Sequence, residues 1–251
     1  MERYASFDGT QIAYGTAGEE PSAGAVLLHH GFASTSQINW VRPGLVDALT
    51  EAGRRVVFID ARGHGESAHP HDPAAYSNNA MATDVRALID HLDLEGVDMA
   101  GYSMGSFVTL AVASDEPRIK SIFLGGAGAA QIRTGGAEWA TAIAEALEAD
   151  DPSTITNASA KAFRNFADAT GQDRLALAAI QRSGNSLSEE LVSSLRLPAL
   201  VVNGEKDTLV GDPGSLAALI DGARSLVVPG DHLSAVVKPE FRDALVSWAT
   251  S

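Results

Sequence analysis

Six short apolar runs, each followed by glycine or a polar turn, constrain the fold of this chain more than any other feature. Each run has only three to five residues, which is too short for a helix. Near-continuous apolar strands of this kind are typical of a parallel sheet that is covered on both faces. The six runs are residues 25–28, 55–59, 97–100, 121–124, 200–202 and 225–228.

Segments with helical spacing separate several of these runs. Apolar residues between 81 and 92 recur every three to four positions and form one stripe of an amphipathic helix, and residues 241–248 repeat the pattern. Alternation of strand and helix predicts a doubly wound α/β fold with a mostly parallel sheet. The chain starts differently, because residues 4–7 and 11–14 flank an Asp8-Gly9 turn and predict an antiparallel hairpin at the sheet edge.

One long stretch interrupts the alternation. Between residues 129 and 190 no strand is expected, but three alanine-rich, helix-favouring segments occur at residues 138–149, 159–169 and 174–182. We therefore expect residues 1–128 and 191–251 to form the two parts of one core domain. Residues 129–190 are expected to form a small helical cap insertion that packs on it.

Charge and cysteine content narrow the classes of function. The chain has 32 acidic and 18 basic residues and a formal charge of −14, and no run of Lys or Arg is present. Such a surface repels phosphate and anionic lipid, so we expect no nucleic-acid and no membrane partner. The absence of cysteine excludes disulfides and thiol catalysis. With no apolar signal core and no apolar run near the ~20 residues that span a bilayer, the sequence predicts a cytoplasmic protein.

The strongest chemical signal is the pentapeptide Gly-Tyr-Ser-Met-Gly at residues 101–105. It follows an apolar run and precedes a helix-favouring stretch at residues 107–113. A sharp turn from strand to helix would hold Ser103 at the carboxyl end of the sheet, and the glycines would relieve crowding around the strained backbone. Ser103 is therefore the predicted nucleophile.

A serine hydroxyl is a weak nucleophile until a histidine accepts its proton and a carboxylate orients the imidazole. In this motif the partners follow in the order serine, acid, histidine. Of the seven histidines only His232 lies after Ser103, in a loop beyond the last apolar run. Asp207 lies 25 residues earlier in the turn after another run and is the predicted acid, with Glu205 and Asp212 as nearby alternatives.

A tetrahedral intermediate also needs two hydrogen-bond donors for its oxyanion. The backbone N–H of Met104, directly after the nucleophile, is one candidate. The other is the N–H of Phe32, in the loop that follows the first apolar run. Both predictions depend on position alone, because a backbone donor has no side-chain signature.

Together these segments resemble the α/β-hydrolase superfamily, and within it the capped single-domain serine hydrolases that include esterases, lactonases and carbon–carbon bond hydrolases. The resemblance runs from Asp8 to the last helix and leaves the cap uncovered. Ser106 stands where many relatives have a second glycine, and serine replaces the nucleophilic aspartate of similar epoxide hydrolases and haloalkane dehalogenases. The matching segments are residues 30–32 (oxyanion loop), 60–67 (D-x-R-G-H-G-x-S), 101–105 (nucleophile elbow), 204–207 (acid loop) and 230–232 (histidine loop).

Other histidines invite different interpretations. His64 could be read as a second base, but a turn after a buried strand explains the charged segment around it better. His69 and His71 lie in a proline-containing loop with irregular spacing and no third ligand nearby, so no metal site is predicted. His29 is expected to pack or to form hydrogen bonds.

The sequence thus predicts a serine hydrolase, and first a carboxylesterase, that acts on a small-molecule acyl substrate through an acyl-enzyme without a cofactor. A lactonase or carbon–carbon bond hydrolase is the second interpretation, and an acyltransferase or perhydrolase the third. From another class, a ligand-binding receptor could keep the fold and the triad. The oligomeric state stays open.

Overall fold

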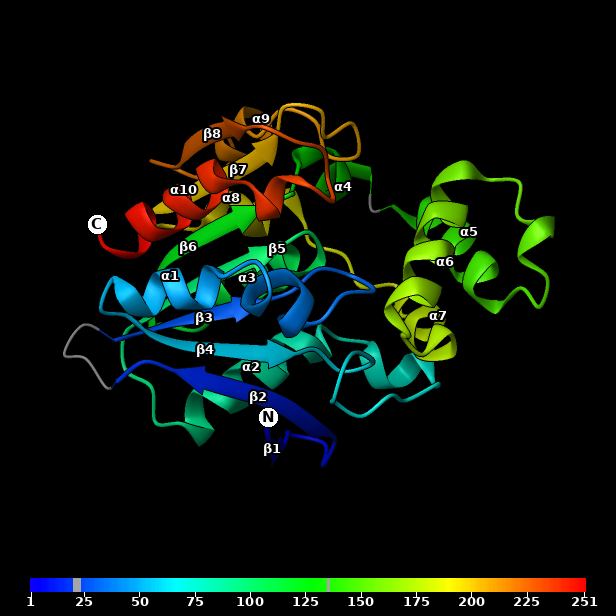
Figure 1. Ribbon diagram of the computed structural model, residues 1–251, viewed down its shortest axis with the longest axis horizontal. Helices are drawn as coiled ribbons and strands as arrows, with labels where there is room; N and C mark the ends of the chain where they lie inside the picture. The colour runs from blue at the N-terminus through cyan, green and yellow to red at the C-terminus, as the bar shows by residue number, and fades with distance from the viewer. Residues whose placement is uncertain (20–23, 135) are drawn as a thin grey trace.

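An eight-stranded sheet forms the centre of the computed structural model, which describes residues 1–19, 24–134 and 136–251 (Figure 1). The strand order is β1-β2-β4-β3-β5-β6-β7-β8. The β1–β2 and β2–β4 pairs are antiparallel and the other pairs are parallel. The strands are β1 (Glu2–Ala5), β2 (Gln11–Ala17), β3 (Ala25–His29), β4 (Arg55–Asp60), β5 (Val97–Tyr102), β6 (Ile119–Gly125), β7 (Ala199–Gly204) and β8 (Arg224–Val228).

Helices cover both faces of this sheet. Apolar residues of α1 and α10 pack on one face, whereas those of α2, α3 and α9 pack on the other. The doubly wound fold class is therefore confirmed. The helices and short helical turns are η1 (Gln37–Val41), α1 (Leu45–Glu51), η2 (Pro73–Tyr76), α2 (Ala80–His91), α3 (Met104–Ala113), α4 (Ala129–Thr134), α5 (Ala137–Glu148), η3 (Pro152–Thr154), α6 (Ala158–Thr170), α7 (Arg174–Arg182), α8 (Glu189–Ser194), α9 (Gly214–Ala217), η4 (Ala235–Val237) and α10 (Pro239–Ala249).

The continuous apolar character of the central strands follows from burial on both sides. In β3, Val26 and Leu28 pack with α1 and α10, whereas Ala25 and Leu27 face the opposite layer. Successive side chains of a strand point to opposite faces, so a strand covered twice needs apolar residues at every position. All six predicted runs lie within strands of the sheet.

The N-terminal hairpin is confirmed, with a longer turn than expected. β1 ends at Ala5, and backbone bonds from Ser6 to Thr10 and from Gly9 to Ser6 close the turn. Phe7, expected in the first strand, lies in this turn and is 57% exposed. The Asp8-Gly9 signal therefore identified the turn but not where the strand ends.

The described residues between β6 and β7 form five α-helices, where three helices were expected. α5, α6 and α7, here called the outer helices, stand beyond the carboxyl ends of the strands in Figure 1. They share a separate apolar cluster, which also contains Phe32 and Ala33 from the loop after β3. α4 and α8 instead contribute Ile132 and Val192 to the main core.

No helix in the described ranges is long and apolar enough to cross a membrane.

The strand order brings distant loops together at one edge. β3 lies between β4 and β5, so the direction of chain winding reverses there, and ligands of such sheets bind beyond the strand ends at this point. His29 pairs with Gly101, and Gly204 pairs with Val228. The loops that follow these four strands, β3, β5, β7 and β8, contain the predicted site residues.

Candidate active site

Ser103 occupies the sharp turn between β5 and α3. Its φ of 53° and ψ of −116° are unusual for a residue with a side chain. Its N–H donates to the carbonyl of Gly125 at 2.7 Å, which fixes the turn to the neighbouring strand. The side chain is half-buried at the carboxyl end of the sheet.

Two glycines make this turn possible because the backbone segments approach one another closely. A Cβ on Gly101 would lie 2.2 Å from the carbonyl oxygen of Gly105. A Cβ on Gly105 would lie 2.1 Å from the carbonyl oxygen of His29. Ser106 is fully buried, and its hydroxyl is within hydrogen-bond distance of the Gly101 and Gly125 carbonyls. Helix α3 therefore accommodates serine where many relatives have glycine.

The predicted base and acid meet Ser103 in a continuous chain of polar contacts. His232 Nε2 lies 3.0 Å from Ser103 Oγ, and His232 Nδ1 lies 2.8 Å from Asp207 Oδ2. The Asp207 side chain is fully buried, and its other oxygen accepts bonds from the N–H groups of Leu209 and Val210. The imidazole is 13% exposed.

These contacts define which ring nitrogen can accept a proton. An ionised carboxylate only accepts hydrogen bonds, so the Asp207 contact requires a proton on His232 Nδ1. In the neutral imidazole Nε2 is then an acceptor, and it faces the hydroxyl of Ser103. The arrangement can take the hydroxyl proton as the oxygen attacks an electrophile.

The two alternative acids lie elsewhere. Glu205 is exposed and lies 3.7 Å from the ammonium of Lys206. Asp212 accepts a bond from the N–H of Gly214 at the start of α9. No contact with His232 is found for either carboxylate among the described residues.

The two predicted oxyanion donors flank the nucleophile. A Cβ on Gly31 would lie 3.4 Å from Ser103 Cβ, so the loop that carries Phe32 runs close beside the nucleophile. Within the described ranges, the N–H groups of Phe32 and Met104 have no hydrogen-bond acceptor. Two unpaired donors beside one hydroxyl can stabilise negative charge that develops on a substrate oxygen.

Side chains that sequence analysis did not assign to the site hold this loop in place. Asn39 accepts a bond from the Gly31 N–H at 2.8 Å. His30 donates from Nδ1 to the Gly31 carbonyl and accepts at Nε2 from the Ala61 N–H. Burial lowers the pKa of His30, which keeps the ring neutral and able to accept. Asn39 lies in η1, and no local sequence pattern identifies it.

His64 belongs to the same framework. Its Nε2 accepts a bond from the Ala33 N–H at 3.1 Å, and its Nδ1 contacts the Arg62 carbonyl at 3.2 Å. Burial lowers the pKa of His64 well below its ordinary value. With both nitrogens bonded to backbone, the ring supports the loop and is not available as a second base.

Two further residues connect the loops around the site. Buried Asn203 bonds to both the N–H and the carbonyl of Ala127 and to the Gly211 carbonyl. Tyr102 donates its hydroxyl to the backbone carbonyl of His232 at 2.7 Å. Neither contact can be read from spacing, because both join loops that are far apart in the chain.

The remaining histidine candidates are placed away from this constellation. His71 pairs with Asp173 at the start of α7 at 2.9 Å, and no group of three or more metal-ligating side chains occurs in the described part of the chain.

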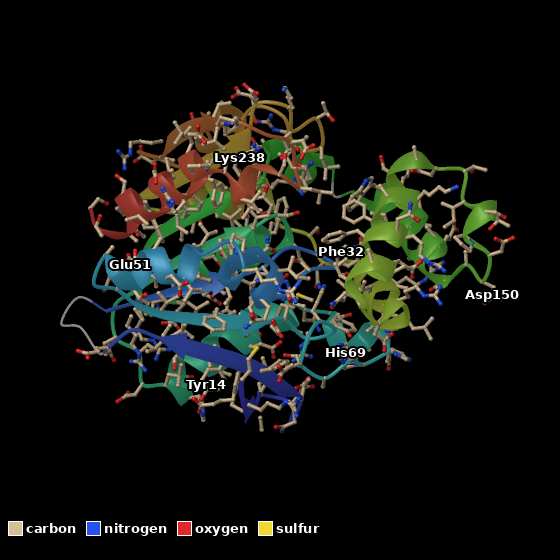
Figure 2. All side chains as sticks on the ribbon, viewed as in Figure 1. Tyr14, Phe32, Glu51, His69, Asp150 and Lys238 are labelled. Carbon is tan, nitrogen blue, oxygen red and sulfur yellow. The ribbon has the colours of Figure 1, made fainter. Side chains whose placement is uncertain are left out.

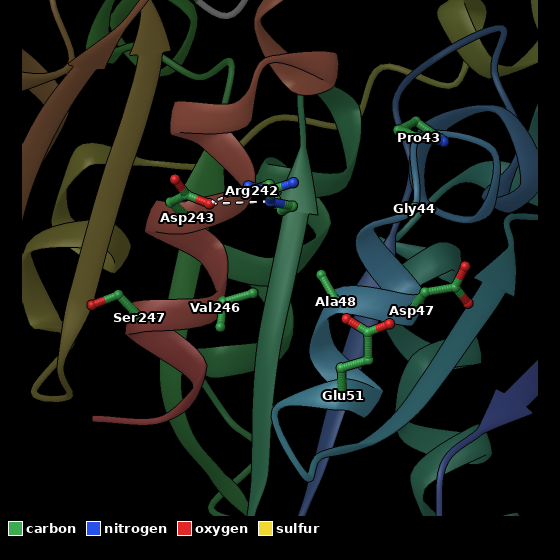
Figure 3. A pocket seen from close by; sticks show the side chains of 9 residues that line it. All are labelled: Pro43, Gly44, Asp47, Ala48, Glu51, Arg242, Asp243, Val246 and Ser247. Atoms are coloured by element: carbon green, nitrogen blue, oxygen red, sulfur yellow. Dashed lines mark hydrogen bonds and ion pairs between the residues drawn. The ribbon is translucent and has the colours of Figure 1, made fainter.

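A surface groove of about 540 Å³ between α1 and α10 contains none of the five predicted site residues (Figure 3). Pro43, Gly44, Asp47, Ala48, Glu51, Arg242, Asp243, Val246 and Ser247 line it.

Comparison with known proteins identifies relatives. Residues 24–153 match the family model described as alpha/beta hydrolase fold. A curated relative from Pseudomonas putida, the dihydrolipoyllysine-residue acetyltransferase component of an acetoin cleaving system, is 34% identical over 81% of this chain. That alignment covers 57% of the relative, so the chain spans only part of its length.

Solved structures match over nearly the whole chain. A hydrolase from Pseudomonas aeruginosa PA01 superimposes with a TM-score of 0.81 and 27% identity, covering 100% of this chain and 98% of the other. An esterase from Exiguobacterium antarcticum has a TM-score of 0.82 at 22% identity, with 99% of each chain covered. At that identity the second likeness shows a common fold alone.

Proposed function

Because the chain belongs to the α/β-hydrolase fold family, we propose that it is a serine hydrolase and that it cleaves a small-molecule carboxylic ester. One observation carries the proposal: Ser103 Oγ, the His232 imidazole and the Asp207 carboxylate form a continuous chain with contacts of 3.0 and 2.8 Å. This is the arrangement that activates a serine for acyl transfer.

In the proposed first step Ser103 Oγ attacks the ester carbonyl while His232 Nε2 takes its proton. Asp207 keeps the imidazole oriented and stabilises its charged form. The N–H groups of Phe32 and Met104 hold the oxyanion of the tetrahedral intermediate. His232 then gives the proton to the departing alcohol, which leaves the acyl group on Ser103.

In the second step water attacks the acyl-enzyme while His232 again acts as the base. The acid product leaves and Ser103 recovers its proton. All these groups come from the protein and water, so the proposed route uses no cofactor.

Aromatic side chains between the loop after β3 and the outer helices support an apolar substrate group. The Phe32 ring lies 5.9 Å from that of Phe163 in α6, and Phe163 lies 5.3 Å from Trp139 in α5. Trp139 is 39% exposed although its ring is large and apolar. Figure 2 shows Phe32 where the strand ends meet the outer helices. An aromatic row that begins at the oxyanion loop favours a small aryl or alkyl ester.

The test is hydrolysis of p-nitrophenyl acetate, butyrate and octanoate by the wild type and by Ser103→Ala, together with labelling by a fluorophosphonate probe. We expect turnover and labelling in the wild type and neither in Ser103→Ala. Labelling without ester turnover would redirect the search to lactones, carbon–carbon substrates, acyl acceptors other than water, or a receptor. No labelling at all would refute the proposal.

The role of Asp207 is tested by two variants that each replace a carboxylate with an amide. Asp207→Asn should lower kcat by about 10³–10⁴-fold, because the amide favours the wrong imidazole tautomer. Glu205→Gln removes a neighbouring exposed carboxylate and should leave kcat unchanged. Equal losses in the two variants would contradict the assignment of Asp207.

A further inference from the structure

A side chain next to the nucleophile links it to the histidine loop, residues 229–234. Tyr102 is the last residue of β5 and directly precedes Ser103. Its hydroxyl donates to the backbone carbonyl of His232 at 2.7 Å, and the two rings lie 5.8 Å apart. The residue that is covalently joined to the nucleophile therefore also holds the base.

The Tyr102 ring has little freedom to move. It is 4% exposed, and Phe241 of α10 packs edge-on against it with centroids 5.7 Å apart. Two glycines also lie against the ring: a Cβ on Gly125 would come within 2.7 Å of it, and one on Gly126 within 3.1 Å. The ring fills the space that these missing side chains leave. Its hydroxyl is therefore a fixed point from which the histidine loop can be aligned.

The hydroxyl also stays in its donating form. Burial raises the pKa of Tyr102 above its ordinary value, and the carboxylates of Asp207 and Asp231 raise it further. The phenol is thus protonated over the pH range in which a histidine base operates.

Other bonds in the histidine loop involve groups other than the His232 carbonyl. Asp231 accepts from the N–H groups of Leu233 and Ser234, and the Gly230 carbonyl accepts from the Lys206 N–H. These bonds set the shape of the turn. In the described part of the chain Tyr102 is the donor found on the His232 carbonyl.

We propose that Tyr102 is a positioning residue that keeps the His232 imidazole in line between Asp207 and Ser103. The path from Ser103 through the Tyr102 side chain to the His232 backbone is short. His232 is thus linked to Ser103 twice, through the Tyr102 hydroxyl at its backbone carbonyl and through the 3.0 Å contact between its Nε2 and Ser103 Oγ. The inference rests on the proposed function, since alignment matters only if His232 transfers the proton.

Tyr102→Phe tests the inference because it removes one oxygen and keeps the packed ring. A misplacement of about 1 Å in a catalytic group can cost on the order of 10²-fold in rate. We expect kcat on p-nitrophenyl butyrate to fall at least about tenfold, with KM changed less than twofold. The rate of fluorophosphonate labelling should fall in parallel, because His232 is the base in that reaction too.

Tyr76→Phe is the matched control. Tyr76 is also buried, and its hydroxyl donates to the backbone carbonyl of Pro70 at 2.6 Å, away from the histidine loop. Both variants lose a buried hydroxyl-to-carbonyl bond and should lose comparable melting temperature. Only Tyr102→Phe should lose kcat, which separates positioning from stability.

A second readout covers the case in which Tyr102→Phe is poorly stable at the assay temperature. The His232 Nδ1 proton can be followed by NMR in the cold, and a looser imidazole should exchange this proton with water faster. Unchanged exchange and a kcat equal to that of Tyr76→Phe would overturn the inference while the proposed function stands. Full turnover by Ser103→Ala would instead remove the proposed function itself.

Discussion

Replacing His29 with leucine is expected to make the protein less stable at pH 8 and more stable at pH 5. His29 ends β3 and is buried, and its Nδ1 contacts the His30 carbonyl at 3.1 Å. Its Nε2 has no hydrogen-bond partner within the described ranges. Burial lowers the pKa of His29 to about 3, with a smaller contribution from His30. The folded protein therefore keeps this ring neutral in mild acid.

The magnitude follows from the difference between folded and unfolded chains. An imidazole in the unfolded chain takes up a proton near pH 6.5, whereas the folded ring does so only near pH 3. Between these values each pH unit of acidification removes about 1.4 kcal/mol of stability. At pH 5 the loss due to this one histidine is about 2 kcal/mol, and at pH 8 it is absent.

Leucine abolishes that loss but also removes one hydrogen bond, which contributes about 1 kcal/mol. His29→Leu should therefore be about 1 kcal/mol less stable than the wild type at pH 8 and about 1 kcal/mol more stable at pH 5. The two stability curves should cross near pH 6.

Urea unfolding followed by circular dichroism, at pH 8 and at pH 5, measures both free energies. His91→Gln, which changes an exposed histidine at the end of α2, is the control and should shift stability by a similar amount at both pH values. If His29→Leu changes stability with the same sign and size at pH 8 and pH 5, burial does not keep His29 neutral.

Three further predictions concern a buried aromatic ring, a glycine next to the proposed base and a buried arginine. Phe241→Ala should lower the free energy of unfolding by about 3–5 kcal/mol, because the ring is fully buried against two aromatic neighbours; a loss below about 1 kcal/mol in urea unfolding would contradict this. Gly126→Ala should lower kcat at least about tenfold with unchanged circular dichroism, since φ is 61° and the new Cβ would lie 3.3 Å from His232 Cε1; wild-type kcat would argue against it. Arg164→Met removes the Arg164 donor from the buried Ala146 carbonyl and from the part-buried Ala149 carbonyl near the end of α5, so hydrogen exchange should accelerate in the outer helices and not in the sheet.

Local sequence signals predicted the strands well because one physical requirement dominates them. A strand buried on both faces must be apolar throughout, and such runs are visible without any knowledge of the fold. Helix α1 was not predicted. It has only seven residues, begins after Gly44 in a left-handed conformation, and has no side-chain cap. Short helices of this kind depend on tertiary packing more than on their own sequence.

The proposed catalytic groups could be predicted because each has a local context: a glycine-flanked turn for Ser103 and a strand end for Asp207 and for His232. The residues that hold them have no such context. Asn39 and Tyr102 each act through one backbone atom of another residue, and any donor or acceptor of similar reach would serve. Asn39 lies eight residues beyond Gly31 in the segment between β3 and α1, and nothing in the local sequence indicates that its side chain turns back to this N–H.

The oxyanion loop contributes Phe32 to the apolar cluster of the outer helices, and this has consequences for those helices. Gly31 lies beside Ser103 and is held by Asn39 and His30, whereas Phe32 and Ala33 are buried with side chains of α5, α6 and α7. The proposed donor N–H of Phe32 lies between these two anchors. Because packed clusters transmit small displacements, a change within the outer helices should alter kcat as well as substrate preference. The outer helices, whose segment has the least sequence signal, are therefore expected to affect the geometry of the proposed site.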